Sequence, residues 1–177
     1  MANNCYNHIS IIGDKEELKS FVQEMEIRTD GHDKYAELCS IYGKEGDDGR
    51  WFDIDIEDTS DDGCISIFGD SAWCPCLKIF GKISEKYKSF KIHYEYEEPG
   101  CDFAGWADIE DGNIDDHCFT YYKGMVEMGE EERLINDIEF MGFESEEELL
   151  SSNLYLAANT DELRGEILEE YRNTKNN

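Results

Sequence analysis

Proline and basic residues are both scarce in this sequence, and long hydrophobic runs are absent. Only two of the 177 residues are proline, which excludes the proline-rich composition of many disordered linkers. No stretch approaches the roughly 18 apolar residues that span a membrane. The N-terminus has neither the basic nor the apolar segment of a signal peptide. We therefore expect a cytoplasmic protein that does not associate with a membrane.

The shortage of basic residues makes the chain strongly acidic. Lys and Arg number 16 against 43 Asp and Glu, which gives a formal net charge of −27. Charge at this level is typical of disordered chains, but 40% hydrophobic and 12% aromatic residues are typical of a folded domain. The negative charge disfavours direct binding to nucleic acid. We expect a basic protein as the partner, and many basic surfaces are those of nucleases or other nucleic-acid-binding effectors.

The cysteines do not form a pattern that predicts a metal site or a disulfide framework. Their number is odd, and no secretory signal precedes them, so we expect reduced thiols. The closest pair flanks Pro75, and a single intervening residue is unusual for a zinc knuckle. We therefore expect no metal and no other cofactor. The seven cysteines are Cys5, Cys39, Cys64, Cys74, Cys76, Cys101 and Cys118.

Alternation of polar and apolar residues predicts strands, and apolar spacing of three and four predicts helices. One helix begins at Asp14, with Glu17 as a capping box, and a second runs from Pro75 to about Tyr87. The segment 35–42 is ambiguous, and a turn follows over 43–49. The predicted strands cover residues 4–12, 51–58, 64–68, 90–97, 103–109 and 114–122.

The C-terminal region is predicted to be helical from Glu130 onward. One helix ends near Gly142, and Ser145 and Thr160 are N-cap candidates for two more. The element order β-α-β-β-α-β predicts an α+β fold with a ferredoxin-like antiparallel sheet, an added β-hairpin and C-terminal helices. We expect a ferredoxin-like domain over residues 1–122 and a helical segment over 123–177, packed on or beside it.

Three motifs resemble the YubB-like, ferredoxin-like proteins of phages and conjugative plasmids. They are Met1-Ala2-Asn3-x-Cys5-x-Asn7, Ser71-Ala72-Trp73-x-Pro75, and Tyr96-Glu97-Glu98-Pro99-Gly100-Cys101-Asp102-Phe103-Ala104-Gly105. The resemblance covers roughly residues 1–122 and leaves out the C-terminal helices. It implies a ferredoxin-like fold and an origin on a mobile element. It implies no active site.

The acidic residues are concentrated in stretches that contain no Lys or Arg. Residues 51–77 hold seven acids and no base, and residues 92–122 hold nine acids and no base. A lysine-rich segment over 78–91 separates these stretches. Asp53, Asp55 and Glu57 alternate along one predicted strand, so their side chains would share one face at intervals of ~6.7 Å.

These two stretches supply the partner-binding surface that the sequence predicts. Trp106 is included because an exposed tryptophan among charges is a candidate interface anchor. Whether the acids share one face depends on the order of the strands. The predicted residues are Asp53, Asp55, Glu57, Asp58, Asp61, Asp62, Glu95, Glu97, Glu98, Asp102, Trp106, Asp108 and Glu110.

No catalytic motif is recognisable. The acids from Asp53 onward resemble a calcium loop, but Asp58 and Cys64 occupy the positions that an EF-hand gives to Gly and Glu. No histidine has a nucleophile in a recognisable local motif, and neither a phosphate-binding loop nor a Gly-x-Gly-x-x-Gly motif is present. We therefore expect a protein that is not an enzyme.

These observations lead to one leading hypothesis and two alternatives. The leading hypothesis is an inhibitor, encoded by a mobile element, that binds a host defence protein through an acidic surface. The target would be a CRISPR effector or a restriction nuclease, and the surface would act as an anti-CRISPR or anti-restriction DNA mimic. The first alternative is an acidic module for protein binding or assembly without mimicry. The second is an enzyme. The oligomeric state stays open.

Overall fold

The computed structural model describes residues 4–27 and 51–176 of the chain. The predicted ambiguous segment 35–42 and the turn over 43–49 lie outside these residues. Contacts divide the chain into two units. The first comprises Met1–Asp102 and Trp106–His117, and the second comprises Phe103–Gly105 and Cys118–Asn177. We had placed the domain boundary after residue 122.

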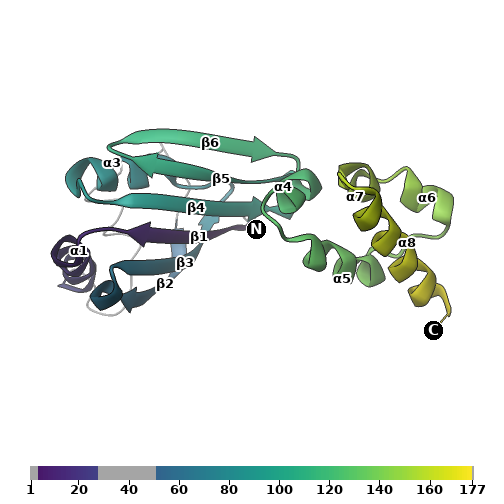
Figure 1. The fold of residues 1–177 in the computed structure, drawn as a ribbon, viewed down its shortest axis with the longest axis horizontal. Helices are drawn as coiled ribbons and strands as arrows, with labels where there is room; N and C mark the ends of the chain where they lie inside the picture. The colour runs from purple at the N-terminus through teal and green to yellow at the C-terminus, as the bar shows by residue number, and fades with distance from the viewer. Residues whose placement is uncertain (1–3, 28–50, 177) are drawn as a thin grey trace. The chain divides into compact units, whose positions relative to one another are not determined.

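The first unit contains the ferredoxin-like order that the sequence predicts, drawn in Figure 1. The strands predicted for residues 4–12 and 51–58 are found almost without change, and the third strand is four residues longer than predicted. The elements are β1 (Asn4–Ile12), α1 (Lys15–Ile27), β2 (Trp51–Thr59), η1 (Ser60–Asp62), β3 (Cys64–Ala72), α3 (Leu77–Lys86), β4 (Lys91–Glu98), η2 (Pro99–Cys101), β5 (Phe103–Glu110) and β6 (Asn113–Phe119). The start of β5 and the end of β6 fall in the second unit.

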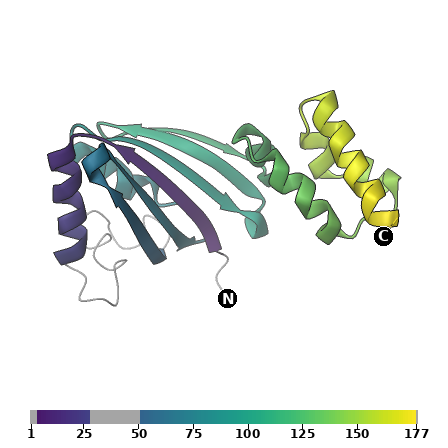
Figure 2. The same ribbon diagram turned by 60° about the horizontal axis from the view of Figure 1, so that its bottom comes forward.

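In the described residues the strands form one six-stranded sheet in the order β2-β3-β1-β4-β5-β6. The strand β1 lies in the middle and pairs antiparallel with both β3 and β4. The twist of this sheet is seen in Figure 2. The fold is α+β and ferredoxin-like, extended by the β5–β6 hairpin. The opposite hairpin, β2–β3, contains an irregularity between Phe52 and Asp55.

One face of the sheet is buried, and the helices account for the burial. On β1, Ile9 and Ile11 are fully buried, whereas Ile12 on the other face is 62% exposed. On α1, the apolar stripe from Leu18 to Met25 is buried. On α3, Phe80 packs edge-to-face against Tyr94 of β4 at 5.1 Å between ring centroids. Apolar burial on this face therefore holds the sheet and the two helices together.

The start of α1 is capped by Asp14, whose Oδ1 accepts hydrogen bonds from the backbone N–H groups of Glu16 and Glu17. Glu17 does not complete a capping box. Its carboxylate instead accepts from the backbone N–H and the hydroxyl of Ser89, and the Ser89 hydroxyl accepts from the Asp14 N–H. A tertiary contact has therefore replaced the local one, and it ties α1 to the segment before β4.

The second unit is helical and contains two helices that the sequence did not predict. The helix α4 begins at Tyr121, where we had expected β6 to continue to residue 122. The buried residues Tyr121, Met125 and Val126 recur at helical spacing, which explains the change. The elements are α4 (Tyr121–Glu127), α5 (Glu131–Met141), α6 (Glu146–Leu150), α7 (Asn153–Ala157) and α8 (Asp161–Asn176).

The caps of these helices follow the prediction in two cases. The Ser145 hydroxyl accepts from the N–H of Glu148, and the Thr160 hydroxyl accepts from the N–H of Leu163. Gly142, in the left-handed conformation at φ 65°, ends α5 as predicted. The core of the unit is a buried cluster that includes Leu134, Leu149 and Ile167. The last helix of the chain, α8, continues to Asn176.

Candidate interaction surface on the open face of the sheet

The sheet face opposite α1 and α3, called here the open face, carries polar and aromatic side chains. Alternation along each strand decides which residues reach it. On β4, Lys91, His93, Glu95 and Glu97 point to the open face, whereas the intervening residues are buried. The carboxylates that lie on the open face are Asp55, Glu57, Asp70, Glu95, Glu97, Asp108, Glu110 and Asp115.

Strand pairing aligns six side chains of the open face, one from each strand, in one row across the sheet. His8 lies opposite Phe68 on one side and Glu95 on the other, and Phe68 lies opposite Asp55. His93 contacts Asp108 across the next pair of strands, so Glu95 lies opposite Trp106 two residues further along. Five strand intervals of ~4.8 Å make this row ~24 Å long. The central row is Asp55, Phe68, His8, Glu95, Trp106 and His117.

Two pairs of stacked rings interrupt the carboxylates of the central row. The rings of His8 and Phe68 are almost parallel, at 3° and 4.6 Å between centroids. The rings of Trp106 and His117 lie at 19° and 5.0 Å. Phe68 is 42% exposed, which is high for a phenylalanine in a sheet, because no helix within residues 4–27 and 51–176 covers this face. Stacking pre-orders these side chains, so a ligand that contacts them loses less side-chain entropy.

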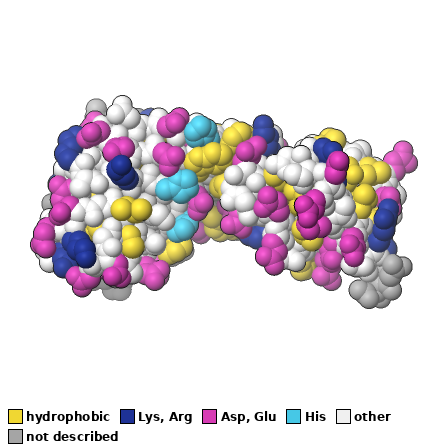
Figure 3. Space-filling view, viewed as in Figure 1, with side chains coloured by type: hydrophobic (Ala, Val, Ile, Leu, Met, Phe, Trp, Pro, Cys, Tyr) yellow, Lys and Arg dark blue, Asp and Glu magenta, His cyan; other side chains and the backbone are white. Residues whose placement is uncertain are grey.

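Imidazoles and carboxylates alternate in a connected chain of contacts on the open face. Asp108 lies 2.7 Å from Nδ1 of His93, and Nε2 of His93 lies 3.6 Å from Glu95. The second oxygen of Glu95 lies 2.9 Å from Nδ1 of His8. The described histidines lie on the face that Figure 3 shows. These contacts fix the positions of two imidazoles and two carboxylates along the open face.

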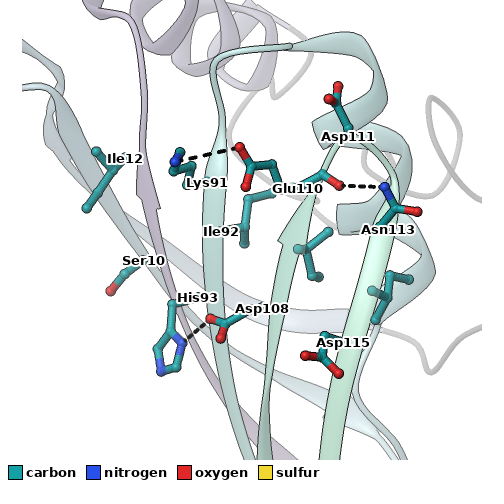
Figure 4. A pocket seen from close by; sticks show the side chains of 12 residues that line it. Ser10, Ile12, Lys91, Ile92, His93, Asp108, Glu110, Asp111, Asn113 and Asp115 are labelled. Carbon is teal, nitrogen blue, oxygen red and sulfur yellow. Dashed lines mark hydrogen bonds and ion pairs between the residues drawn. The ribbon is translucent and has the colours of Figure 1, made fainter.

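A groove of about 630 Å³ crosses the open face near the turn between β5 and β6. It is lined by Lys91, His93, Asp108, Glu110 and Asp115 among others (Figure 4). Lys91 lies 3.7 Å from Glu110, so the lysine of this groove is paired within it. The charged side chains of the groove are mainly carboxylates, which lie among isoleucines such as Ile12 and Ile114, so its charge favours a cationic ligand.

The structure brings together only part of the surface predicted from the sequence. Asp55, Glu57, Glu95, Glu97, Trp106, Asp108 and Glu110 share the open face. Asp58, Asp61, Asp62 and Asp102 do not, and Glu98 is buried, with 2% exposure. The side chain of Asp53 lies outside the described residues.

The excluded acids have identifiable local roles. Asp58 accepts a hydrogen bond from the N–H of Ser60 at the start of η1. Asp61 pairs with Lys19 of α1 at 2.7 Å, and the hydrogen bond to this ammonium group lowers the pKa of Asp61. Asp102 ends η2 in the left-handed conformation, at φ 56°. Asp58 therefore stabilises a turn, and Asp61 forms an ion pair with α1. The sequence pattern did not separate these acids from those of the open face.

The three sequence motifs meet at one end of the sheet, around a buried polar network that the sequence did not reveal. Asn7 donates hydrogen bonds to the Ser71 hydroxyl at 3.0 Å and to the backbone carbonyl of Gly69 at 3.0 Å. The Tyr94 hydroxyl donates to Asn7 at 2.9 Å and accepts from the N–H of Cys76 at 3.1 Å. The network therefore links β1, β3 and β4 to the start of α3.

Cys5 and Glu98 lie beside this network. Burial raises the pKa of the Cys5 thiol to about 12, with a smaller contribution from the nearby Glu98 carboxylate. One oxygen of Glu98 is buried and makes no hydrogen bond. Alternation on β4 places Glu98 on the same face as Tyr94 and Tyr96, and this signal was present in the sequence. These residues therefore belong to the interior of the sheet.

The open face offers charge and aromatic surface but no arrangement suited to holding a metal ion. Within residues 4–27 and 51–176, no three His, Cys, Asp or Glu side chains form a group that could hold one. The six cysteines in that part of the chain are free thiols. None of the helices described is both long and apolar enough to cross a membrane.

Comparison with known proteins places the chain in a family. No curated protein and no solved structure matches it. A family model described as a ferredoxin-like domain in Api92-like protein matches residues 52–149, which is more than half of the chain. The match begins in β2 and ends in α6. It includes the strands β2 to β6, which build most of the open face, and the helix α3 that packs beneath them. The chain therefore belongs to the family of Api92-like proteins with this ferredoxin-like domain.

Proposed function

We propose that this protein binds a basic protein partner through the open face and carries out no catalysis. The observation that carries the proposal is the grouping of eight carboxylates from five strands on the open face, around two pairs of stacked rings. Aromatic anchors surrounded by charge are typical of interfaces. None of the described helices covers this face, and Asp55, Glu57 and Asp108 are exposed on it.

The charge density of the open face supports contact with a basic surface more than imitation of a duplex. Eight carboxylates equal ~14 Å of double-stranded DNA at one charge per ~1.7 Å. The central row alone spans ~24 Å, so the face has about half the linear charge of a duplex. Competition with nucleic acid would then come from occupying a basic groove, and the aromatic side chains would supply the remaining affinity.

The biological setting that we propose is a mobile genetic element. The resemblance of the three motifs to YubB-like proteins of phages and plasmids supports it, and those motifs build the support of the open face. In this setting the partner is a nucleic-acid-binding defence protein of the host, such as a CRISPR effector or a restriction nuclease. An acidic module that assembles with a basic protein of the element itself is the second candidate, and the same surface would serve it.

The proposal is tested by reversing charges on and off the open face. The triple variant Asp55→Lys, Glu57→Lys and Asp108→Lys changes three exposed acids of the open face. The matched control, Asp62→Lys, Glu85→Lys and Glu166→Lys, changes three exposed acids elsewhere and alters the net charge equally. Each protein is immobilised and exposed to bacterial lysate, and captured proteins are identified by mass spectrometry.

We expect the wild type and the control to retain the same basic protein, and the open-face variant to lose it. Added DNA or RNA should displace the captured protein if the partner is a nucleic-acid-binding effector. Retention by the open-face variant, or retention by none of the three proteins, would overturn the proposal. Circular dichroism confirms that each variant is folded.

A further inference from the structure

We infer that the central row recognises arginine in particular, on an extended segment with two arginines four residues apart. This inference rests on the proposed function, because it specifies the chemistry of the same partner. The order of side chains along the central row carries the inference. A carboxylate comes before the first stacked pair, and a second carboxylate lies between the first pair and the second.

Each stacked pair has a carboxylate beside it on the neighbouring strand. Phe68 has Asp55 on the neighbouring strand, and Trp106 has Glu95 on its neighbour. Side chains opposite each other on adjacent strands have Cβ atoms ~4.5–5.5 Å apart. Each stacked pair therefore presents a ring next to a carboxylate, twice in one row.

An aromatic ring beside a carboxylate fits a guanidinium group better than an ammonium group. A guanidinium group is planar, so it can stack on an aromatic ring while its N–H groups donate to a carboxylate. An ammonium group is compact and more strongly hydrated, and it cannot stack. The combination of ring and carboxylate therefore favours arginine over lysine, although total charge alone would not distinguish them.

The distance between the two stacked pairs matches the length of four residues in an extended chain. The centres of the two stacked pairs are three strand intervals apart, which is ~14 Å. An extended chain advances ~3.3 Å per residue, so four residues cover this distance, and an even number returns both side chains to the same side. A segment with arginines four residues apart can then contact both pairs at once.

Nucleobases, which also stack on aromatic rings, are disfavoured at this site. Each base is attached to a phosphate, and the central row has a carboxylate beside each stacked pair. Proteins that bind single strands combine stacking rings with a positively charged groove, whereas the groove on the open face is acidic. The occupant that fits both the rings and the charge is a protein segment.

The test uses the full-length protein and synthetic peptides with calorimetric titration. One peptide has two arginines four residues apart in an uncharged sequence, the second has lysines instead, and the third has arginines three residues apart. We expect the first peptide to bind about five-fold more tightly than the second, which corresponds to ~0.5 kcal/mol at each of the two stacked pairs. It should also bind more tightly than the third. Trp106→Leu should remove the preference for spacing and weaken the preference for arginine, whereas Trp73→Leu, at an exposed tryptophan outside the row, should retain both.

The outcomes separate this inference from the proposed function. Equal affinity for the arginine and lysine peptides, lost in the Asp55→Lys, Glu57→Lys and Asp108→Lys variant, would overturn the arginine preference and leave the proposed function in place. Equal affinity for the two arginine spacings would overturn the two-pair geometry. Binding that survives the triple reversal would overturn both.

Discussion

At the scale of single residues, the motifs that are easiest to notice in the sequence are structural. Cys5 and Asn7 begin β1, and Asn7 links three strands through its side-chain amide. Burying a polar group costs free energy unless its hydrogen bonds are made, and Asn7 makes them. The motif resemblance therefore identifies residues that hold one end of the sheet together, while the candidate contact residues lie in the middle of the open face.

Cys5 provides a test of this buried end. Its pKa is raised by burial from 9.0 to about 12, so the folded protein keeps the thiol protonated at neutral pH. We expect Cys5 to resist iodoacetamide at pH 8, whereas Cys74 and Cys118, which are exposed, react. Because the folded pKa is the higher one, the contribution of Cys5 to stability is complete below pH 9 and is lost as the pH rises toward 12.

Mass spectrometry of the alkylated protein measures this difference directly. In denaturant all three cysteines should react at similar rates, which controls for intrinsic reactivity. Alkylation of Cys5 in the folded protein as fast as that of Cys74 would contradict the buried position of β1.

At the scale of elements, the sequence predicted strands and long helices better than short helices. The strand β1 was predicted to the residue because its alternation is strict and both ends have turn residues. The helices α4 and α7 were missed because seven and five residues contain too few turns to show a period. Glu98 was placed on the surface although alternation on β4 assigned it to the interior, since its charge was given more weight than its position.

Gly124 in α4 makes a close contact that a side chain would break. A Cβ atom there would lie 2.4 Å from the backbone oxygen of Ala104, and backbone cannot move aside as a flexible side chain can. We expect Gly124→Ala to destabilise the protein by ~1–3 kcal/mol, as overpacking does. Urea denaturation followed by circular dichroism measures the change.

Gly165 in α8 is the matched control, because it is exposed and no atom lies within 4 Å of an added Cβ. Alanine there should stabilise the helix by ~0.5–1 kcal/mol. If Gly124→Ala stabilised the protein as Gly165→Ala is expected to do, the close approach of α4 to Ala104 would be wrong.

At the scale of the whole molecule, the central row is what the sequence could not predict. Alternation showed which residues share a face of one strand, and Asp55, Glu57 and Trp106 were selected on that basis. Which strands are neighbours depends on topology, and β1 lies between β3 and β4 although both come later in the chain. His8 was therefore not selected from the sequence, and its stacking on Phe68 appears only in the folded sheet.

The net charge of −27 leads to a prediction about the stability of the whole molecule. Like charges on a compact protein repel one another and favour the expanded state. Exposed ion pairs such as Lys19–Asp61 and Arg172–Glu146 oppose this only weakly, because solvent screens the attraction between exposed charges. Repulsion among the excess acids should therefore outweigh the pairs, and screening by salt should stabilise the fold.

We expect the Tm to rise as NaCl increases from about 0.01 M to about 0.15 M, because the Debye length falls from ~30 Å to ~8 Å over that range. The Asp62→Lys, Glu85→Lys and Glu166→Lys protein has less excess charge, so it should have a higher Tm at low salt and a smaller rise. Scanning calorimetry measures both. Binding to an arginine peptide should weaken over the same range, since salt screens that attraction as well. A Tm that falls with salt would mean that the ion pairs, and not the repulsion, dominate the electrostatics of this protein.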